Sequence, residues 1–122
     1  MRVMAVDDEP DILKIVEMSL ARWGYVVDGF TDPVAALDHF RANAPDYALI
    51  LTDIRMPEMS GAELARRAKE IRPGVKVMIM TAFEVDRDLK QALPTIESSG
   101  FLQKPFHTAD LCVAIKRHLA EA

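Results

Sequence analysis

Short apolar runs alternate with longer amphipathic segments five times along this chain, and that order constrains the fold more than any other feature. The runs in the middle of the chain are almost continuously apolar, which is typical of parallel strands that are buried on both faces. Each run is followed by a segment in which apolar residues recur at helical spacing. The order predicts an α/β fold, with one parallel sheet covered by helices on both faces. The predicted strands span residues 2–6, 25–30, 47–52, 75–81 and 100–103.

The first predicted helix has a clear apolar stripe. Ile12, Val16, Leu20 and Trp23 recur at spacings of four, four and three residues, so we expect them to form the buried face. Gly24 follows as a left-handed stop. These residues therefore predict both the inner face of the helix and its end.

The fourth helix is the least regular of the five. It is expected to begin near Glu84, but Pro94 would then fall in its interior at a cost of about 3 kcal/mol. We therefore predict a short or irregular helix that ends by about Leu93.

Length and composition limit the number of domains and the kinds of partner. The chain has 122 residues, which fits one domain over residues 1–122. Its formal net charge of -4 argues against direct binding to nucleic acid, which needs a basic surface. With one cysteine, Cys112, and no evident leader or apolar run of about 18 residues, we expect a cytoplasmic chain without a membrane anchor.

Polar side chains follow four of the predicted strands at the point where each strand ends. Asp7 and Asp8 follow the first strand, Asp53 the third, Thr81 closes the fourth, and Lys104 follows the fifth. Functional groups in such sheets lie beyond the carboxyl ends of the strands, so these five side chains should share one crevice. One lysine cannot neutralise three carboxylates, and a site of oxygen ligands without imidazole or thiolate suits Mg²⁺. The sequence thus predicts a magnesium site.

Four stretches make the chain similar to the CheY-like response-regulator receiver domains of two-component signalling. They are "AVDDEPDI" at residues 5–12, "LILTDIRMPEMSG" at 49–61, "VMIMTAF" at 77–83 and "GFLQKPF" at 100–106. The resemblance covers the whole chain. It implies a single (βα)5 doubly wound domain over residues 1–122, with five parallel strands in the flavodoxin-like order 2-1-3-4-5.

The resemblance also implies a role for each acidic residue. Asp53 resembles the phosphoacceptor, and Asp8 and Asp53 resemble direct Mg²⁺ ligands. Asp7 resembles a ligand that acts through water, and the backbone carbonyl of Arg55 would complete the protein's share of the metal site.

The remaining motif residues resemble the switch. Thr81 would turn its hydroxyl toward the phosphoryl group, Lys104 would pair with that group, and Phe101 occupies the switch-aromatic position. In this family the peptide between the positions of Lys104 and Pro105 is commonly cis. Phosphorylation is expected to change the surface formed by the fourth helix, fifth strand and fifth helix.

The implied partners follow from these roles. A sensor histidine kinase or a phosphotransfer protein would be the donor, and a downstream protein or an output domain outside this sequence would be the target. The resemblance implies that this chain is not an enzyme that acts on other molecules, because such domains catalyse only their own phosphotransfer and dephosphorylation.

Three other functions can be weighed against this one. A haloacid-dehalogenase phosphatase also uses an aspartate nucleophile, but it resembles "DxDx[TV]", and here Arg55 stands where its second aspartate would be. A flavodoxin-type cofactor binder needs a phosphate cradle in its first loop, where Asp7 and Asp8 would repel the anion. The alternative that stays open is a receiver-like protein-binding module that signals without phosphorylation.

Some residues differ from those usual in receiver domains, and the histidines show no sign of belonging to a site. Phe101 lacks the hydroxyl of the tyrosine often found there, so its inward rotation on activation is in doubt. Arg55 and Phe83, two residues beyond Asp53 and Thr81, are expected to border the path of a hydrolytic water and to slow dephosphorylation. The three histidines have no metal-binding spacing and are expected on the surface or at helix ends. They are His39, His107 and His118.

Overall fold

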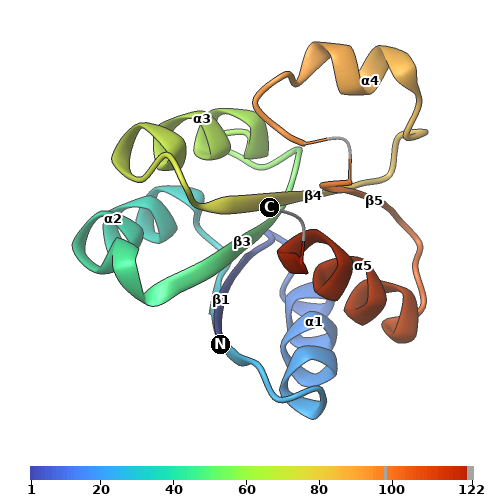
Figure 1. Ribbon diagram of the computed structural model, residues 1–122, viewed down its shortest axis with the longest axis horizontal. Coiled ribbons are helices and arrows are strands. Elements are labelled where there is room, and N and C mark those ends of the chain that lie inside the picture. Colours follow the sequence, from blue (N-terminus) through green and yellow to red (C-terminus); the bar gives the residue numbers. More distant parts are fainter. Residues whose placement is uncertain (98, 121–122) are drawn as a thin grey trace.

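Five parallel strands form one sheet in the order β2-β1-β3-β4-β5, which confirms the predicted topology. The computed structural model describes residues 1–97 and 99–120. Each crossover carries a helix (Figure 1). The chain enters the sheet at β1, continues to the edge strand β2, and then returns to the other side of β1 to form β3, β4 and β5. The strands are β1 Arg2–Val6, β2 Val26–Phe30, β3 Tyr47–Asp53, β4 Lys76–Thr81 and β5 Phe101–Gln103.

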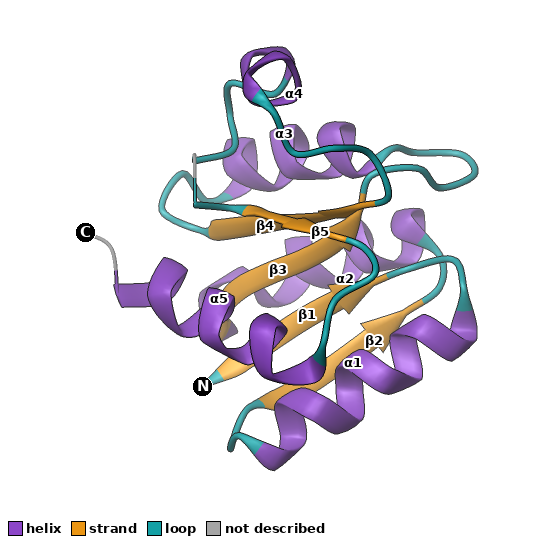
Figure 2. Ribbon diagram, turned by 90° about the vertical axis from the view of Figure 1, so that its right-hand side faces the viewer, coloured by secondary structure: helices purple, strands orange, loops and turns teal. Residues whose placement is uncertain are grey.

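The helices cover both faces of the sheet. In Figure 2, α1 and α5 lie on one face, and α2 and α3 lie on the other. No helix among residues 1–97 and 99–120 is long and apolar enough to cross a membrane. The helices are α1 Pro10–Arg22, α2 Pro33–Asn43, the short 3-10 helix η1 Ala44–Asp46, α3 Gly61–Ile71, α4 Arg87–Ala92 and α5 Thr108–Ala120.

Alternate residues of the inner strands build two separate cores. In β1, Met4 and Val6 face the core shared with α2 and α3, whereas Val3 and Ala5 face the core shared with α1 and α5. All four side chains are fully buried. Burial on both faces explains why the inner strands are almost continuously apolar in the sequence. The double packing fixes the carboxyl edge of the sheet, where the polar residues lie.

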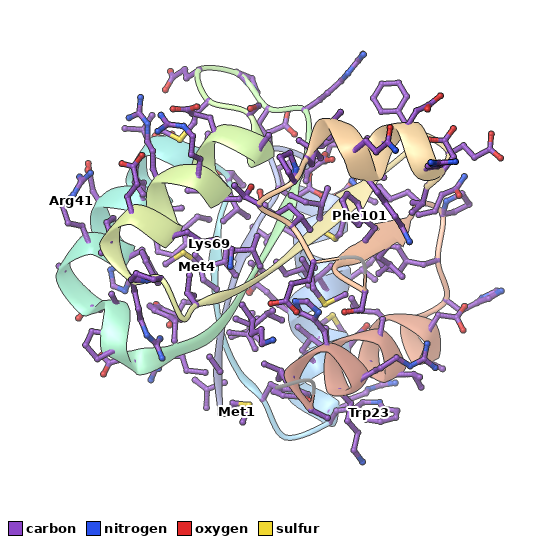
Figure 3. The ribbon with its side chains drawn as sticks, turned by 45° about the horizontal axis from the view of Figure 1, so that its top comes forward. Met1, Met4, Trp23, Arg41, Lys69 and Phe101 are labelled. Carbon is purple, nitrogen blue, oxygen red and sulfur yellow. The ribbon has the colours of Figure 1, made fainter. Side chains whose placement is uncertain are left out.

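The burial of α1 corrects one prediction. Val16 and Leu20 are buried as expected, but Trp23 is 49% exposed, and Leu13 is buried instead. Trp23 is the C-cap residue and lies at the periphery of the molecule (Figure 3). Gly24 adopts a positive φ of 91°, in agreement with the predicted left-handed stop.

His118 corrects a second prediction. Its side chain is buried on α5 rather than placed on the surface, and its ring Nδ1 lies 2.8 Å from the hydroxyl of Ser99, in the segment before β5. A buried polar ring needs such a hydrogen bond. His118 is therefore part of the packing between α5 and the amino end of β5.

The fourth helix is short, as predicted from Pro94. It begins at Arg87, three residues after the expected start, and ends at Ala92. The Asp86 carboxylate caps it by accepting a hydrogen bond from the Leu89 amide at 2.9 Å. None of its residues is buried, and it lies outermost beside β4 and β5 (Figures 1 and 2).

Candidate phosphoacceptor and metal site

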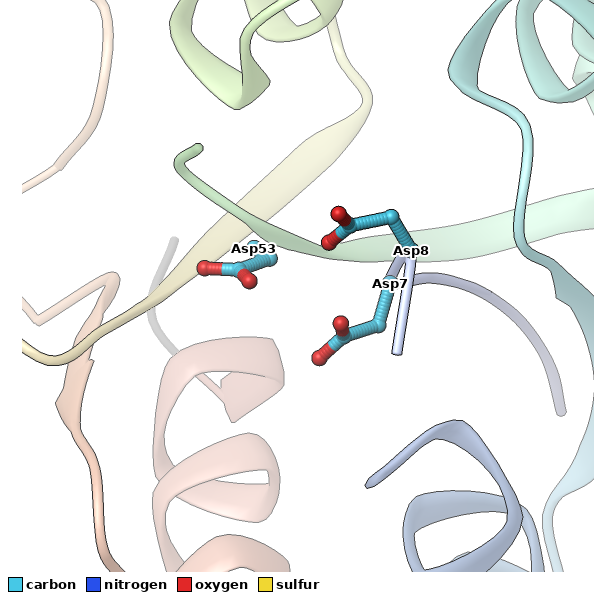
Figure 4. A group of neighbouring side chains, drawn as sticks. All are labelled: Asp7, Asp8 and Asp53. Atoms are coloured by element: carbon cyan, nitrogen blue, oxygen red, sulfur yellow. The ribbon is translucent and has the colours of Figure 1, made fainter. Parts of the chain in front are cut away.

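Three aspartates meet at the carboxyl edge of the sheet, as predicted. Asp7 and Asp8 directly follow β1, and Asp53 is the last residue of the neighbouring β3. Each offers a carboxylate oxygen, and these oxygens lie within 4.8 Å of one another (Figure 4). The parallel pairing of β1 with β3 brings together side chains that are more than forty positions apart in the sequence.

Lys104 joins two of the three carboxylates. Its Nζ lies 3.0 Å from Asp7 Oδ2 and 3.2 Å from Asp53 Oδ2. The other oxygens of these carboxylates accept backbone amides, from Glu9 to Asp7 Oδ1 and from Ile54 to Asp53 Oδ1. The Lys104–Pro105 peptide is cis, in agreement with the resemblance. The Asp53 carboxylate is thus held from two sides, by Lys104 and by the Ile54 amide, and cannot rotate freely.

Burial and charge set the protonation of this group. Burial raises the pKa of Asp7, against the hydrogen bonds from the Glu9 amide and Lys104 that lower it. Burial on its own would lower the pKa of Lys104, but the hydrogen bond and the charge of Asp7, followed by those of Asp53, raise it. Lys104 therefore carries its proton at neutral pH, and a further cation beside Asp7 would favour the charged form of this buried carboxylate.

The donor set fits a hard divalent cation. Three carboxylates and one ammonium have a formal net charge of 1 - 3 = -2, which one Mg²⁺ would balance. Oxygen ligands at an open edge, with no sulfur or imidazole among them, are those that Mg²⁺ prefers. Asp8 and Asp53 line a cavity of about 350 Å³ that opens to solvent, together with Arg55 and Lys104. That volume is sufficient for an ion with its waters.

Thr81 and Phe101 do not line this cavity. Thr81 is fully buried at the end of β4, where its hydroxyl oxygen accepts the Phe83 amide at 3.0 Å and its carbonyl accepts the Lys104 amide at 2.6 Å. Phe101 is half-buried at the start of β5 and packs against the core shared with α2 and α3 (Figure 3). The structure therefore groups Asp7, Asp8, Asp53 and Lys104, and Thr81 and Phe101 are not among the residues that line the cavity.

Gly61 lies against the backbone of Asp53, a contact that no motif in the sequence predicts. A Cβ atom built on Gly61 would lie 2.1 Å from the carbonyl oxygen of Asp53. The Gly61 amide also donates to the Ile54 carbonyl at 2.8 Å. The sequence offers one indication of this close approach: a glycine stands at the first position of a predicted helix, eight residues after Asp53. A side chain at such a position is ordinarily tolerated.

Phe83 and Arg55 line the same cavity on its solvent side. The Arg55 guanidinium carbon lies 4.3 Å from the centre of the Phe83 ring. Both side chains are exposed, and they come from the loops after β3 and β4. The expected slow dephosphorylation at these positions stays a prediction.

The fold and this site define a receiver domain, and comparison with known proteins agrees. A family model described as "Response regulator receiver domain" matches residues 3–116. The chain belongs to this family.

Relatives of different lengths match nearly the whole chain. The response regulator receiver protein CpdR of Brucella abortus is 36% identical over 121 residues, which cover 99% of this chain and 98% of that protein. The transcriptional regulatory protein SpaR of Bacillus subtilis is 34% identical over 97% of this chain. The regulator NtrC of Escherichia coli is 32% identical over the same share. The chain spans about half the length of SpaR (51%) and a quarter of NtrC (24%).

Solved structures share the fold throughout. The chemotaxis protein CheY4 of Vibrio cholerae superposes with a TM-score of 0.84 at 27% identity, over 96% of this chain and 97% of that one. The response regulator TrrA of Thermotoga maritima, solved in complex with Mg²⁺-BeF, gives a TM-score of 0.82 at 28% identity, over 95% and 96%.

Proposed function

We propose that this chain is a signalling switch activated by phosphorylation of Asp53 with Mg²⁺, on transfer from a histidine kinase or a phosphotransfer protein. The observation that carries the proposal is the position of the Asp53 carboxylate. It lies at an open cavity, 3.2 Å from Lys104 and next to two further carboxylates that suit a divalent cation. The Mg²⁺-BeF complex of TrrA supports the same metal for this chain.

The site favours phosphoryl transfer through charge and position. An Asp53 oxygen would attack phosphorus while the bond from phosphorus to the donor's histidine nitrogen breaks and its electron pair returns to the imidazole ring. Bound Mg²⁺ would neutralise charge on the phosphoryl oxygens. Lys104, freed from part of its contact with Asp53, would pair with one of those oxygens, and Asp7 and Asp8 would hold the cation.

The output surface is proposed to be α4, β5 and α5. Once phosphorylated, Asp53 presents oxygens that attract the Thr81 hydroxyl and the Lys104 ammonium. Thr81 and Lys104 begin the loops that lead to α4 and α5. Because no residue of α4 is buried, a change in these loops can move α4 without opening the core. A downstream protein or a linked output domain would bind the altered surface.

Phosphorylation itself is tested by mass. With Mg²⁺ and a small phosphodonor such as acetyl phosphate, the chain is expected to gain one phosphoryl group, which intact mass spectrometry detects and peptide mapping places on Asp53. Asp53→Asn should gain none, whereas Asp38→Asn, on the exposed face of α2, should behave like the wild type. A wild type that gains no mass would favour the protein-binding module that signals without phosphorylation.

Mg²⁺ is expected to stabilise the folded chain before any phosphorylation. At a metal concentration ten times the dissociation constant, the free energy of unfolding should rise by about 1.4 kcal/mol. Urea unfolding with Mg²⁺ or with EDTA measures the difference. Asp8→Asn should lose most of the rise and Asp38→Asn should keep it. An equal rise in both variants would mean that the ion binds elsewhere.

A further inference from the structure

We propose that the stacked pair Arg55–Phe83 is a latch, which holds Phe83 against the Thr81 hydroxyl and so opposes the turn of Thr81 toward Asp53. The consequence of the turn, contact between Thr81 and a phosphoryl group on Asp53, rests on the proposed function. The latch itself is a property of the resting protein and involves neither metal nor phosphoryl group.

Phe83 makes two contacts that belong to different parts of the site. The centre of its ring lies 4.3 Å from the guanidinium carbon of Arg55, so the loop after β4 contacts the loop after β3. Its backbone amide donates to Thr81 Oγ1 at 3.0 Å. One residue therefore joins the acceptor loop, through its side chain, to the switch threonine, through its main chain.

The turn of Thr81 has two possible routes, and each opposes the resting contacts. If Phe83 stays in place, Thr81 Oγ1 moves away and the Phe83 amide loses its acceptor. If the Phe83 amide follows the hydroxyl, the ring is drawn away from Arg55 and the stack is lost. Removing the stack makes the second route easier while every group that would touch the phosphoryl oxygens remains in place.

The size of the effect follows from exposure. The Phe83 residue is 43% exposed, so the stack has the strength of a solvated cation–π contact. Loss of such a contact changes an equilibrium by about two- to fivefold. A ligand that binds only after Thr81 has turned should bind more tightly by the same factor.

The first test uses the resting protein without metal. The stack also holds Phe83 in place in the resting protein, so without the stack the residue 83 amide should separate from Thr81 Oγ1 more often. In Phe83→Leu and in Arg55→Gln, hydrogen exchange of the residue 83 amide, relative to its intrinsic rate, is expected to be two- to fivefold faster than in the wild type. Arg67→Gln is the matched control, because it removes the same charge from the exposed face of α3, away from the cavity. Unchanged exchange in both latch variants would overturn the latch.

The second test uses fluoroberyllate with Mg²⁺, the probe present in the TrrA structure. Phe83→Leu is expected to bind it two- to fivefold more tightly in the wild-type background and to have almost no effect in the Arg55→Gln background, where the stack is already absent. This cycle cancels the loss of the Arg55 charge. An equal effect of Phe83→Leu in both backgrounds would overturn the latch.

The two tests separate the latch from the proposed function. A wild type that does not bind fluoroberyllate would contradict the proposed function, and amide exchange would still decide the latch. Faster exchange would then support it, and unchanged exchange would refute it.

Discussion

Gly61→Ala is expected to lower the free energy of unfolding by about 3 kcal/mol or more, a large effect for one methyl group. The added Cβ would lie 2.1 Å from the Asp53 carbonyl oxygen and 3.0 Å from the Ile54 Cα. Both neighbours are backbone atoms at the end of a buried strand, so no side-chain rotation can relieve the overlap. The start of α3 or the acceptor loop must move, and urea unfolding measures the cost.

Gly29→Ala is the matched control for this prediction. Its Cβ would also meet an atom closely, at 2.3 Å, but that atom is Oε1 of Glu17, the far end of a flexible side chain that can rotate into solvent. We expect a change within about 0.5 kcal/mol. If the two variants lost the same stability, the close approach of Gly61 to the acceptor strand would not be the cause.

Lys104→Met is expected to lower the free energy of unfolding by about 3 kcal/mol at neutral pH without metal. The lysine side chain is 15% exposed, and its partner Asp7 is fully buried. Removing the ammonium leaves that carboxylate, and the one on Asp53, without a cation. The control is Lys76→Met. The Lys76 side chain is 18% exposed, but its partner Glu97 is 42% exposed, so a loss within about 1 kcal/mol is expected.

The loss in Lys104→Met should depend on pH in a defined direction. The pKa of Asp7 is already raised in the folded chain, mainly by burial, and Lys104 is one of the groups that lower it. Without Lys104 the pKa of Asp7 in the folded chain rises further. The variant therefore loses stability as the pH rises through that pKa, and it keeps its stability below about pH 4, where Asp7 is protonated in both the folded and the unfolded chain. Unfolding in EDTA from pH 4 to 8 should show the two proteins diverging as pH rises. A constant difference would mean that the lost lysine acts through packing.

Much of the acceptor site could be predicted from the sequence because parallel strands place their carboxyl ends at one edge. Asp7, Asp53 and Lys104 follow different strands, and the order of strands and helices alone brought them together. The short fourth helix could also be predicted, because Pro94 acts locally on the backbone.

Other features could not be predicted, because they depend on contacts between segments that the spacing of apolar residues does not indicate. Trp23 continues the apolar spacing of α1, but it lies at the helix end and is half exposed. His118 is buried on α5, and its ring shares a hydrogen bond with Ser99, nineteen positions earlier, which no spacing pattern predicts. The stack of Arg55 on Phe83 joins two loops whose conformations no local pattern specifies. Each of these depends on where a loop or a helix end comes to lie.

The exposure of α4 also affects how this molecule can change over time. A helix with no buried residue contributes little to the cores on either face of the sheet, so replacements along Arg87–Ala92 change the stability of the domain very little. The acceptor edge, by contrast, is fixed by buried strands on both sides. Replacements on α4 can therefore create a different binding surface while the arrangement of Asp7, Asp53 and Lys104, and the folding of the domain, stay as they are.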